Sequence, residues 1–133
     1  ASGWYDQGGG DCKSLHVYFK ALPVIKPEKK RAAVLSEFGG YALKLEGHLW
    51  NPQAEFGYRK YASSEALTEA YLGLLENQLK PWIAAGLSAA IYTQTTDVEI
   101  EVNGYLSYDR EVEKMDFGRV RMAHEGLFMS DED

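Results

Sequence analysis

Glu37 is the residue of this sequence best placed to do chemistry. It follows Ser36 and the apolar run Ala32-Ala33-Val34-Leu35, and it precedes Phe38-Gly39-Gly40, where small residues let a substrate approach the backbone. A carboxylate at the end of a buried strand is paired, solvated in a cleft, or used in a reaction. Held ionised by donors, it can attack as a nucleophile. The pattern alone leaves two readings open, a structural ion pair or strand-end cap and a catalytic or binding role.

Two further residues share a face with each other on a predicted strand. His16 and Tyr18 alternate with Val17, so both side chains point the same way. A single strand histidine can also be an ordinary packing residue. His48 and His124 fall in a predicted loop and a predicted helix, so the histidines show no metal-ligand spacing and we expect no metal or other cofactor.

Aromatic side chains gather in the segment 41–61, which shows no sustained period and is predicted to be a long loop. They are Trp50, Phe56, Tyr58 and Tyr61. Such rings either form an apolar platform for a sugar or cover an edge of the core. Loops of this length in a compact domain are usually functional. Ser36 lacks both a nucleophile-elbow glycine pattern and a neighbouring histidine, so a serine hydrolase is not supported.

The charge and composition of the chain limit the classes of partner that it can bind. The 133 residues hold 14 Lys plus Arg against 20 Asp plus Glu, a formal net charge of −6. This sign disfavours nucleic acid and anionic membranes as partners. No apolar run approaches the roughly 18 to 20 residues of a membrane span. A single cysteine, Cys12, excludes an internal disulfide framework.

Hydrophobic periodicity predicts alternating strands and helices. We expect strands over Ser14–Phe19, Ala32–Leu35 and Leu87–Tyr92, and helices over Ser64–Ala85 and from Asp116 to Phe128. The strands are rich in apolar residues, as strands buried on both faces are. The order therefore predicts an α/β fold with a mainly parallel sheet, whose ligands gather at the carboxyl ends of the strands.

The long helix and the segment after the last strand carry specific end signals. Ser63 or Ser64 can cap the helix, Gly86 suits its end, and Pro81 predicts a kink near Asn77 to Trp82. Downstream, Val98–Val102 alternates strictly before Asn103-Gly104, which predicts a hairpin with Tyr105–Tyr108.

Several separated motifs together resemble one enzyme family. They are Val34-Leu35-Ser36-Glu37-Phe38-Gly39-Gly40, the run Ala89–Glu99 that holds Tyr92-Thr93-Gln94, Val102-Asn103-Gly104, and Tyr108-Asp109-Arg110. In this order they resemble glycoside hydrolase family 2, which includes β-galactosidases, β-glucuronidases and β-mannosidases. The likeness covers nearly the whole chain, from Ala1-Ser2-Gly3-Trp4 to about Phe128.

The resemblance implies that residues 1–133 are the C-terminal portion, about strands six to eight, of the family's (β/α)8 TIM barrel, a fold that takes about 250 residues. Glu37 matches the catalytic nucleophile at the end of strand seven. Tyr18 matches a tyrosine that lies beside it, and His16 is implied to contact sugar hydroxyls. Tyr92 matches an aromatic residue at the floor of the sugar site, where many relatives carry tryptophan. Trp50 is a further substrate-binding candidate, with His48 near it.

The implied activity is that of a β-galactosidase-like glycoside hydrolase, which hydrolyses O-glycosidic bonds with retention of configuration. In this reaction a second carboxylic acid protonates the leaving oxygen. In the family that acid belongs to an Asn-Glu pair at the end of strand four, which matches nothing here. Asp6, Asp97, Glu99 and Glu101 are the other carboxylates near predicted strand ends. We therefore expect a carbohydrate-binding chain that carries the nucleophile but is inactive alone.

Ser14 and Phe19 depart from the family, whose close relatives often carry Asp and Pro around the His-x-Tyr element. An alternative is a non-catalytic carbohydrate-binding or scaffold module. Since a partial barrel has open strand edges and apolar faces, we also expect the isolated chain to self-associate. The acidic tail 130–133 is expected to be disordered.

Overall fold

A computed structural model of the chain describes residues 3–18, 21 and 26–129. Along the chain, the elements are β1 (Cys12–Val17), β2 (Ala32–Gly39), β3 (Tyr41–Leu43), β4 (Arg59–Tyr61), α1 (Ser64–Leu74), a π-helical turn (Leu75–Leu79), α2 (Lys80–Ala84), β5 (Leu87–Thr93) and α3 (Phe117–Gly126). Phe19, the predicted end of the first strand, and the predicted disordered tail 130–133 lie outside the described residues.

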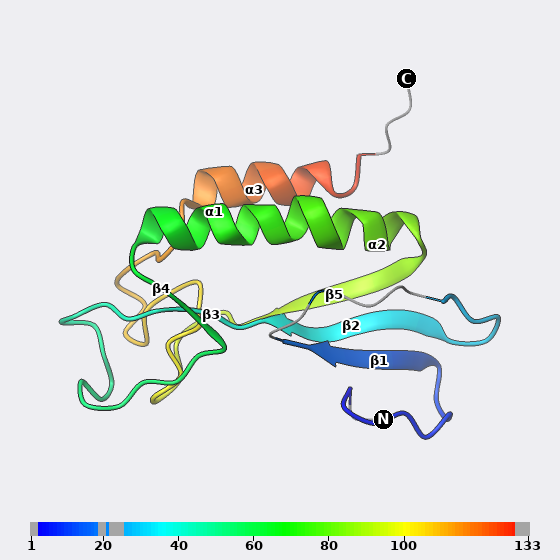
Figure 1. Ribbon diagram of the computed structural model, residues 1–133, viewed down its shortest axis with the longest axis horizontal. Coiled ribbons are helices and arrows are strands. Elements are labelled where there is room, and N and C mark those ends of the chain that lie inside the picture. Colours follow the sequence, from blue (N-terminus) through cyan, green and yellow to red (C-terminus); the bar gives the residue numbers. More distant parts are fainter. Residues whose placement is uncertain (1–2, 19–20, 22–25, 130–133) are drawn as a thin grey trace.

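The architecture is mixed α/β with a small parallel sheet. Strands β1, β2 and β5 form a three-stranded sheet in that order, and β2 pairs in parallel with both neighbours. The sheet is open and is not closed into a barrel (Figure 1). The chain crosses from β2 to β5 through α1 and α2, which lie with α3 on one side of the sheet (Figure 1). The predicted parallel α/β organisation is confirmed.

A bulge in β2 separates the core-facing side chains from the side chain of Glu37. Leu15 pairs with Leu35, but the next residue, His16, pairs with Glu37, so Ser36 is the extra residue. In a regular strand, residues three apart point to opposite faces. Because of the bulge, Leu35 and Phe38 are both buried in the core. Glu37, between Ser36 and Phe38, meets His16 away from this core.

The core lies between the sheet and the helices. Leu35 and Phe38 from β2 pack with Leu67 and Tyr71 of α1 and with Trp82 of α2, and all five are almost completely buried. The helix face that buries these residues repeats at steps of three and four, as the sequence predicts. Trp82, 6% exposed, is the core residue that its helical spacing indicates.

The predicted helix over Ser64–Ala85 forms, with its irregularity where proline requires one. The Ser63 side chain caps it by accepting a hydrogen bond from the amide of Ala66. Pro81 has no N–H to donate to a carbonyl of the preceding turn, and the turn before it widens to a π-helix in which the Lys80 amide reaches Leu75. Gly86 ends the helix at φ 110°, a left-handed conformation that favours glycine.

The predicted long loop contains a second, smaller sheet. Strands β3 and β4 pair in parallel, Ala42 opposite Lys60, so the segment 41–61 begins and ends in strands. Each strand has only three residues, too few for an alternating pattern to be recognised in the sequence. The long-loop prediction is therefore correct only for residues 44–58.

The predicted hairpin at Asn103-Gly104 is wrong. The tight turn lies instead at Val98–Glu101, whose two ends exchange backbone hydrogen bonds of 3.0 and 2.9 Å, with Glu99 at φ 52°. The Gly104 amide donates to the buried carboxylate of Asp97 at 2.8 Å, and a Cβ at Gly104 would lie 2.3 Å from the backbone nitrogen of Asp97. Tertiary contacts, rather than turn geometry, account for this glycine.

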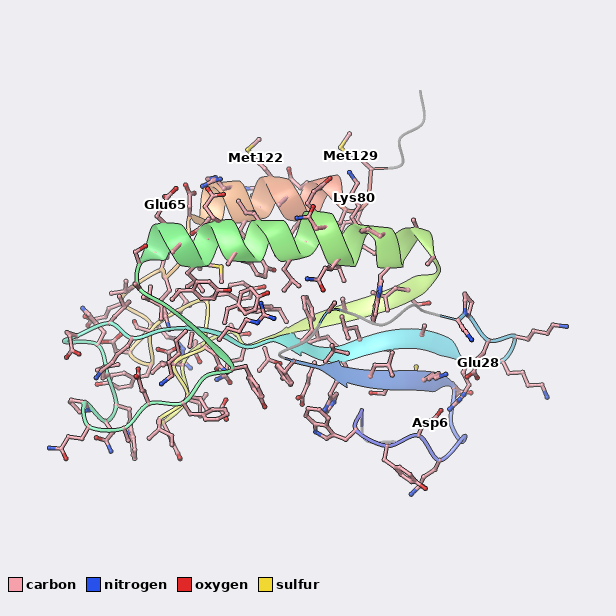
Figure 2. All side chains as sticks on the ribbon, viewed as in Figure 1. Asp6, Glu28, Glu65, Lys80, Met122 and Met129 are labelled. Atoms are coloured by element: carbon pink, nitrogen blue, oxygen red, sulfur yellow. The ribbon has the colours of Figure 1, made fainter. Side chains whose placement is uncertain are left out.

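The final helix forms as predicted. Asp116 caps α3, its carboxylate accepting from the Arg119 amide at 3.1 Å, and Val120 is buried. Met122 and Met129 point away from the rest of the molecule and are each 73% exposed (Figure 2). In the described residues, no helix is long and apolar enough to cross a membrane.

Candidate active site at the carboxyl ends of the strands

The candidate site lies where the three parallel strands end. Tyr18 directly follows β1, Glu37 is near the end of β2, and Thr93 is the last residue of β5. Asp6 and Glu28 mark the opposite end of the sheet, where β1 and β2 begin (Figure 2). Since parallel strands bring their carboxyl ends to one edge, side chains from three segments of the sequence meet there.

A hydroxyl holds the Glu37 carboxylate. Tyr18 Oη lies 2.9 Å from Glu37 Oε2 and 2.7 Å from Thr93 Oγ1. The phenol has one proton, so it donates to the carboxylate while the Thr93 hydroxyl donates to the phenol oxygen. Burial raises the pKa of Tyr18, and the neighbouring Glu37 raises it further, so the phenol keeps its proton at neutral pH. Glu37 itself remains reachable, with 42% of its side chain exposed.

His16 flanks the same carboxylate oxygen. Its Nδ1 lies 3.3 Å from Glu37 Oε2 but is not aligned for a hydrogen bond, and this buried nitrogen has no hydrogen-bond partner among the described residues. Trp4 packs edge-on against the His16 ring at 5.0 Å. Tyr18 and His16 therefore both approach Glu37 at Oε2.

An aromatic wall stands beside the carboxylate. Tyr58, from the loop after β3, stacks face to face on Tyr18 with ring centroids 3.7 Å apart and planes 5° apart. Phe56 packs edge-on against Tyr58 at 5.3 Å and is 41% exposed. Trp4 approaches Tyr18 at 5.9 Å. The site therefore offers apolar ring surface next to an ionisable oxygen, the combination that sugar recognition uses.

A polar network continues the site past the end of β5. Gln94 Nε2 donates to Asn103 Oδ1 at 2.5 Å and to Glu101 Oε2 at 3.2 Å. Asn103 is completely buried, and its Nδ2 has no partner among the residues the structure describes. The peptide bond Thr93–Gln94 at the start of this network is cis. Glu101 is thus held as a hydrogen-bond acceptor.

The Tyr92 ring points away from Glu37, into the core. The Tyr92 ring lies on the helix side, 4.8 Å from Tyr71 and 4.9 Å from Tyr105, and its hydroxyl accepts from the Tyr41 amide at 3.1 Å. Strand alternation turns Thr93 to the Glu37 face and Tyr92 to the core. Trp50 lies in the 44–58 loop and is 56% exposed.

Two other carboxylates from the sequence analysis are engaged elsewhere. Asp6 makes a two-point contact with Arg31 at 2.7 and 2.9 Å, at the amino ends of the strands, and this hydrogen bonding lowers its pKa well below the usual range. Asp97 is buried and bound by Lys114 Nζ at 2.8 Å. Neither is positioned as a partner acid for Glu37.

A second cluster joins two loops and could hold a cation. His48 Nδ1 lies 2.8 Å from Asp109 Oδ2 and 3.9 Å from Glu111 Oε2, and the three ligand atoms lie within 4.8 Å of one another. His48 and Asp109 already form a hydrogen bond with each other, so these two side chains have polar partners without a bound ion. The expectation of no metal and no cofactor stays a prediction.

We expect Asp109 to make stability depend on acid pH. Hydrogen bonds from the Ser107 hydroxyl and then from His48 lower its pKa from 3.8 to about 2. Such a group stabilises the fold above pH 3.8 and loses that contribution as pH falls toward about 2. The destabilisation caused by Asp109→Asn, measured as a urea midpoint, should therefore shrink over that interval. Glu46→Gln, at an exposed carboxylate, is the control, and a constant defect in Asp109→Asn would contradict the prediction.

Thr93 is a site residue that the sequence did not single out. It could have been found, because it shares a face with Ile91 and ends a parallel strand. Tyr58 was one of four aromatic candidates in the predicted loop, and nothing in the sequence selects it among them, since its position depends on the path of the loop. Comparison of the chain with protein-family models and with curated proteins finds no match.

Proposed function

We propose that this chain is part of a retaining β-glycosidase of the glycoside hydrolase family 2 type, with Glu37 as the nucleophile. The observation that carries the proposal is the 2.9 Å hydrogen bond from Tyr18 Oη to Glu37 Oε2 at the carboxyl ends of adjacent parallel strands. Active sites of (β/α)8 barrels lie at that end. Support also comes from the partial exposure of Glu37 and from the aromatic rings beside it.

We also propose that β1, β2 and β5 are strands six to eight of a (β/α)8 barrel. Each of these strands is parallel to its neighbour, and β5 follows a helical crossover. Ile91, two residues before Thr93 on the Glu37 face, is 55% exposed. An apolar side chain on that face would be covered in a closed barrel, whose interior is packed with branched side chains.

In the proposed reaction the two carboxylate oxygens of Glu37 have different roles. Tyr18 and His16 lie against Oε2, so Oε1 attacks the anomeric carbon and forms a glycosyl ester as the aglycone leaves with a proton from an acid. Water, deprotonated by the same group, then cleaves the ester, and the product keeps the original configuration. The acid should stand about 5 to 5.5 Å from Glu37. We propose that it comes from an Asn-Glu pair outside these 133 residues, which hold none.

Covalent trapping tests the proposal without needing that acid. A 2,4-dinitrophenyl 2-deoxy-2-fluoro-β-glycoside has a leaving group that departs without protonation, while the fluorine slows hydrolysis of the ester. We expect mass spectrometry of a digest to place the sugar on the peptide that holds Glu37. Galactosyl, glucosyl and mannosyl reagents should be compared on this chain and on a longer protein that contains it. A protein that hydrolyses β-glycosides but carries the label elsewhere, or gives inverted product, would overturn the assignment.

The isolated chain should self-associate. Strands β1 and β5 are the two edges of the open sheet, and an apolar cavity of about 440 Å³ opens beside β5, lined in part by Leu75, Leu79 and Ala90. Unpaired edges and contiguous apolar surface promote association. Light scattering at rising concentration should show species larger than a monomer. A monodisperse monomer at high concentration would contradict this prediction.

Ile91→Lys tests which face associates. A lysine there replaces apolar surface on the open face by charge and should weaken association about tenfold. Met122→Lys is the matched control, because Met122 is also exposed but projects from the outer side of α3 (Figure 2). If both substitutions weaken association equally, the open sheet face is not the contact.

A further inference from the structure

We propose that Tyr58 is a positioning residue for the nucleophile, which acts on Glu37 through Tyr18. This inference rests on the proposed function, since it assigns a role within the same site. Tyr58 lies in the loop between β3 and β4, and its ring covers a face of the Tyr18 ring, 3.7 Å away and within 5° of parallel. The phenol that it covers is the one that donates to Glu37.

A backbone hydrogen bond and two glycines place Tyr58 at this position. The Tyr58 amide, directly before β4, donates to the carbonyl of Gly40 at 3.1 Å. Gly40 has φ 63°, and a Cβ there would lie 2.3 Å from Tyr58 Cδ2 and 3.1 Å from Tyr18 Cε1. A Cβ at Gly57 would lie 2.2 Å from the Cβ of Ala42. Two glycines thus permit the close approach that sets one ring on the other.

The stack controls where the Tyr18 hydroxyl points. The O–H bond of a phenol lies near the plane of its ring, so the ring orientation sets the direction of the proton. Tyr18 Oη must meet Glu37 Oε2 at 2.9 Å and Thr93 Oγ1 at 2.7 Å at the same time. A flat partner on the ring face restricts the tilt and displacement that would break either contact. Tyr58 therefore keeps one carboxylate oxygen engaged and the other directed at the substrate.

Electrostatics keep Tyr58 suited to this role. Burial raises its pKa, and the negative charges of Glu101 and Glu37 raise it further. The ring therefore stays neutral beside the carboxylate at neutral pH, and its contribution to Tyr18 is one of shape rather than charge. The ring, and not the hydroxyl, is the part of Tyr58 that the role requires.

Kinetics of a β-glycosidase that contains this chain test the proposal. We expect Tyr58→Leu, which removes the ring, to lower kcat about fivefold, the size of a lost aromatic pair, with KM nearly unchanged. Tyr58→Phe keeps the stack and should stay within about twofold of the parent. Tyr18→Phe should cost about 30-fold, as loss of a hydrogen bond to a charged group does. The double variant Tyr18→Phe with Tyr58→Leu should be no slower than Tyr18→Phe alone.

The outcomes separate the two proposals. An additive double variant, or a Tyr58→Leu variant in which only KM changes, would overturn the positioning role while leaving Glu37 as nucleophile. Activity that survives Glu37→Gln would instead refute the proposed function. If Tyr58→Leu does not fold, Tyr58→His is the substitute, because it keeps a smaller planar ring. Its kcat should be lower than those of the parent and Tyr58→Phe, but should fall by less than the loss expected when the stack is removed. A kcat below that of Tyr18→Phe would refute the role. Tyr108→Leu, at an exposed tyrosine, controls for the substitution itself.

Discussion

Glu37→Gln should reduce hydrolysis of β-glycosides by at least about a thousandfold, the effect of removing a covalent nucleophile. Glutamine has the size of glutamate, and its amide oxygen can still accept from Tyr18 Oη, which lies 2.9 Å from Oε2 in the parent. The fold should therefore be retained while the attacking oxygen loses its charge. Initial rates on a nitrophenyl β-glycoside, measured with a protein that contains this chain, give the comparison.

A smaller substitution at the same position adds a stereochemical test. Glu37→Gly leaves a space where a small anion can enter beside the anomeric carbon. Azide should then restore part of the activity on a dinitrophenyl β-glycoside and give the α-glycosyl azide, because it attacks from the face that Glu37 occupied. Tyr18→Phe provides the control, since it leaves the nucleophile in place and should show no azide rescue. Full activity of Glu37→Gln would contradict the assignment.

Local signals predicted those parts of the fold that local chemistry controls. The Ser63 and Asp116 caps, the end of the helix at Gly86 and the irregularity before Pro81 each depend on one side chain and its own helix. The three parallel strands were recognisable because their segments are rich in apolar and β-forming residues. Glu37, Tyr18 and His16 of the candidate site were found by the same logic, since all three lie in these strands or directly after them.

Features that depend on distant contacts were beyond the sequence. The bulge at Ser36 and the pairing of β3 with β4 are both settled between segments far apart in the chain. Asn103-Gly104 has the composition of a hairpin turn, but the Gly104 amide donates a hydrogen bond to the carboxylate of Asp97 instead. Each difference comes from a tertiary contact that overrides a local preference.

Lys114→Met should destabilise the fold by about 3 to 5 kcal/mol, the cost of leaving a buried charge without its partner. The Lys114 side chain is 0% exposed and that of Asp97 is 4% exposed, with Nζ 2.8 Å from Asp97 Oδ1 and 2.7 Å from the Val102 carbonyl. Burial raises the pKa of Asp97 and lowers that of Lys114, so each charge depends on the other. Denaturant unfolding at neutral pH measures the loss.

Two comparisons isolate the buried charge as the cause. Asp97→Asn combined with Lys114→Met should recover much of the loss, because the amide can still accept from the Gly104 amide and carries no charge. Arg121→Met breaks a pair whose side chains are 82% and 62% exposed and should cost no more than about 1 kcal/mol. The defect of Lys114→Met should also shrink as pH falls, since a carboxyl whose pKa is raised by folding binds its proton more readily in the folded state. A defect that is independent of pH and unrelieved by Asp97→Asn would mean that the lysine stabilises the fold through its packing and not through its charge.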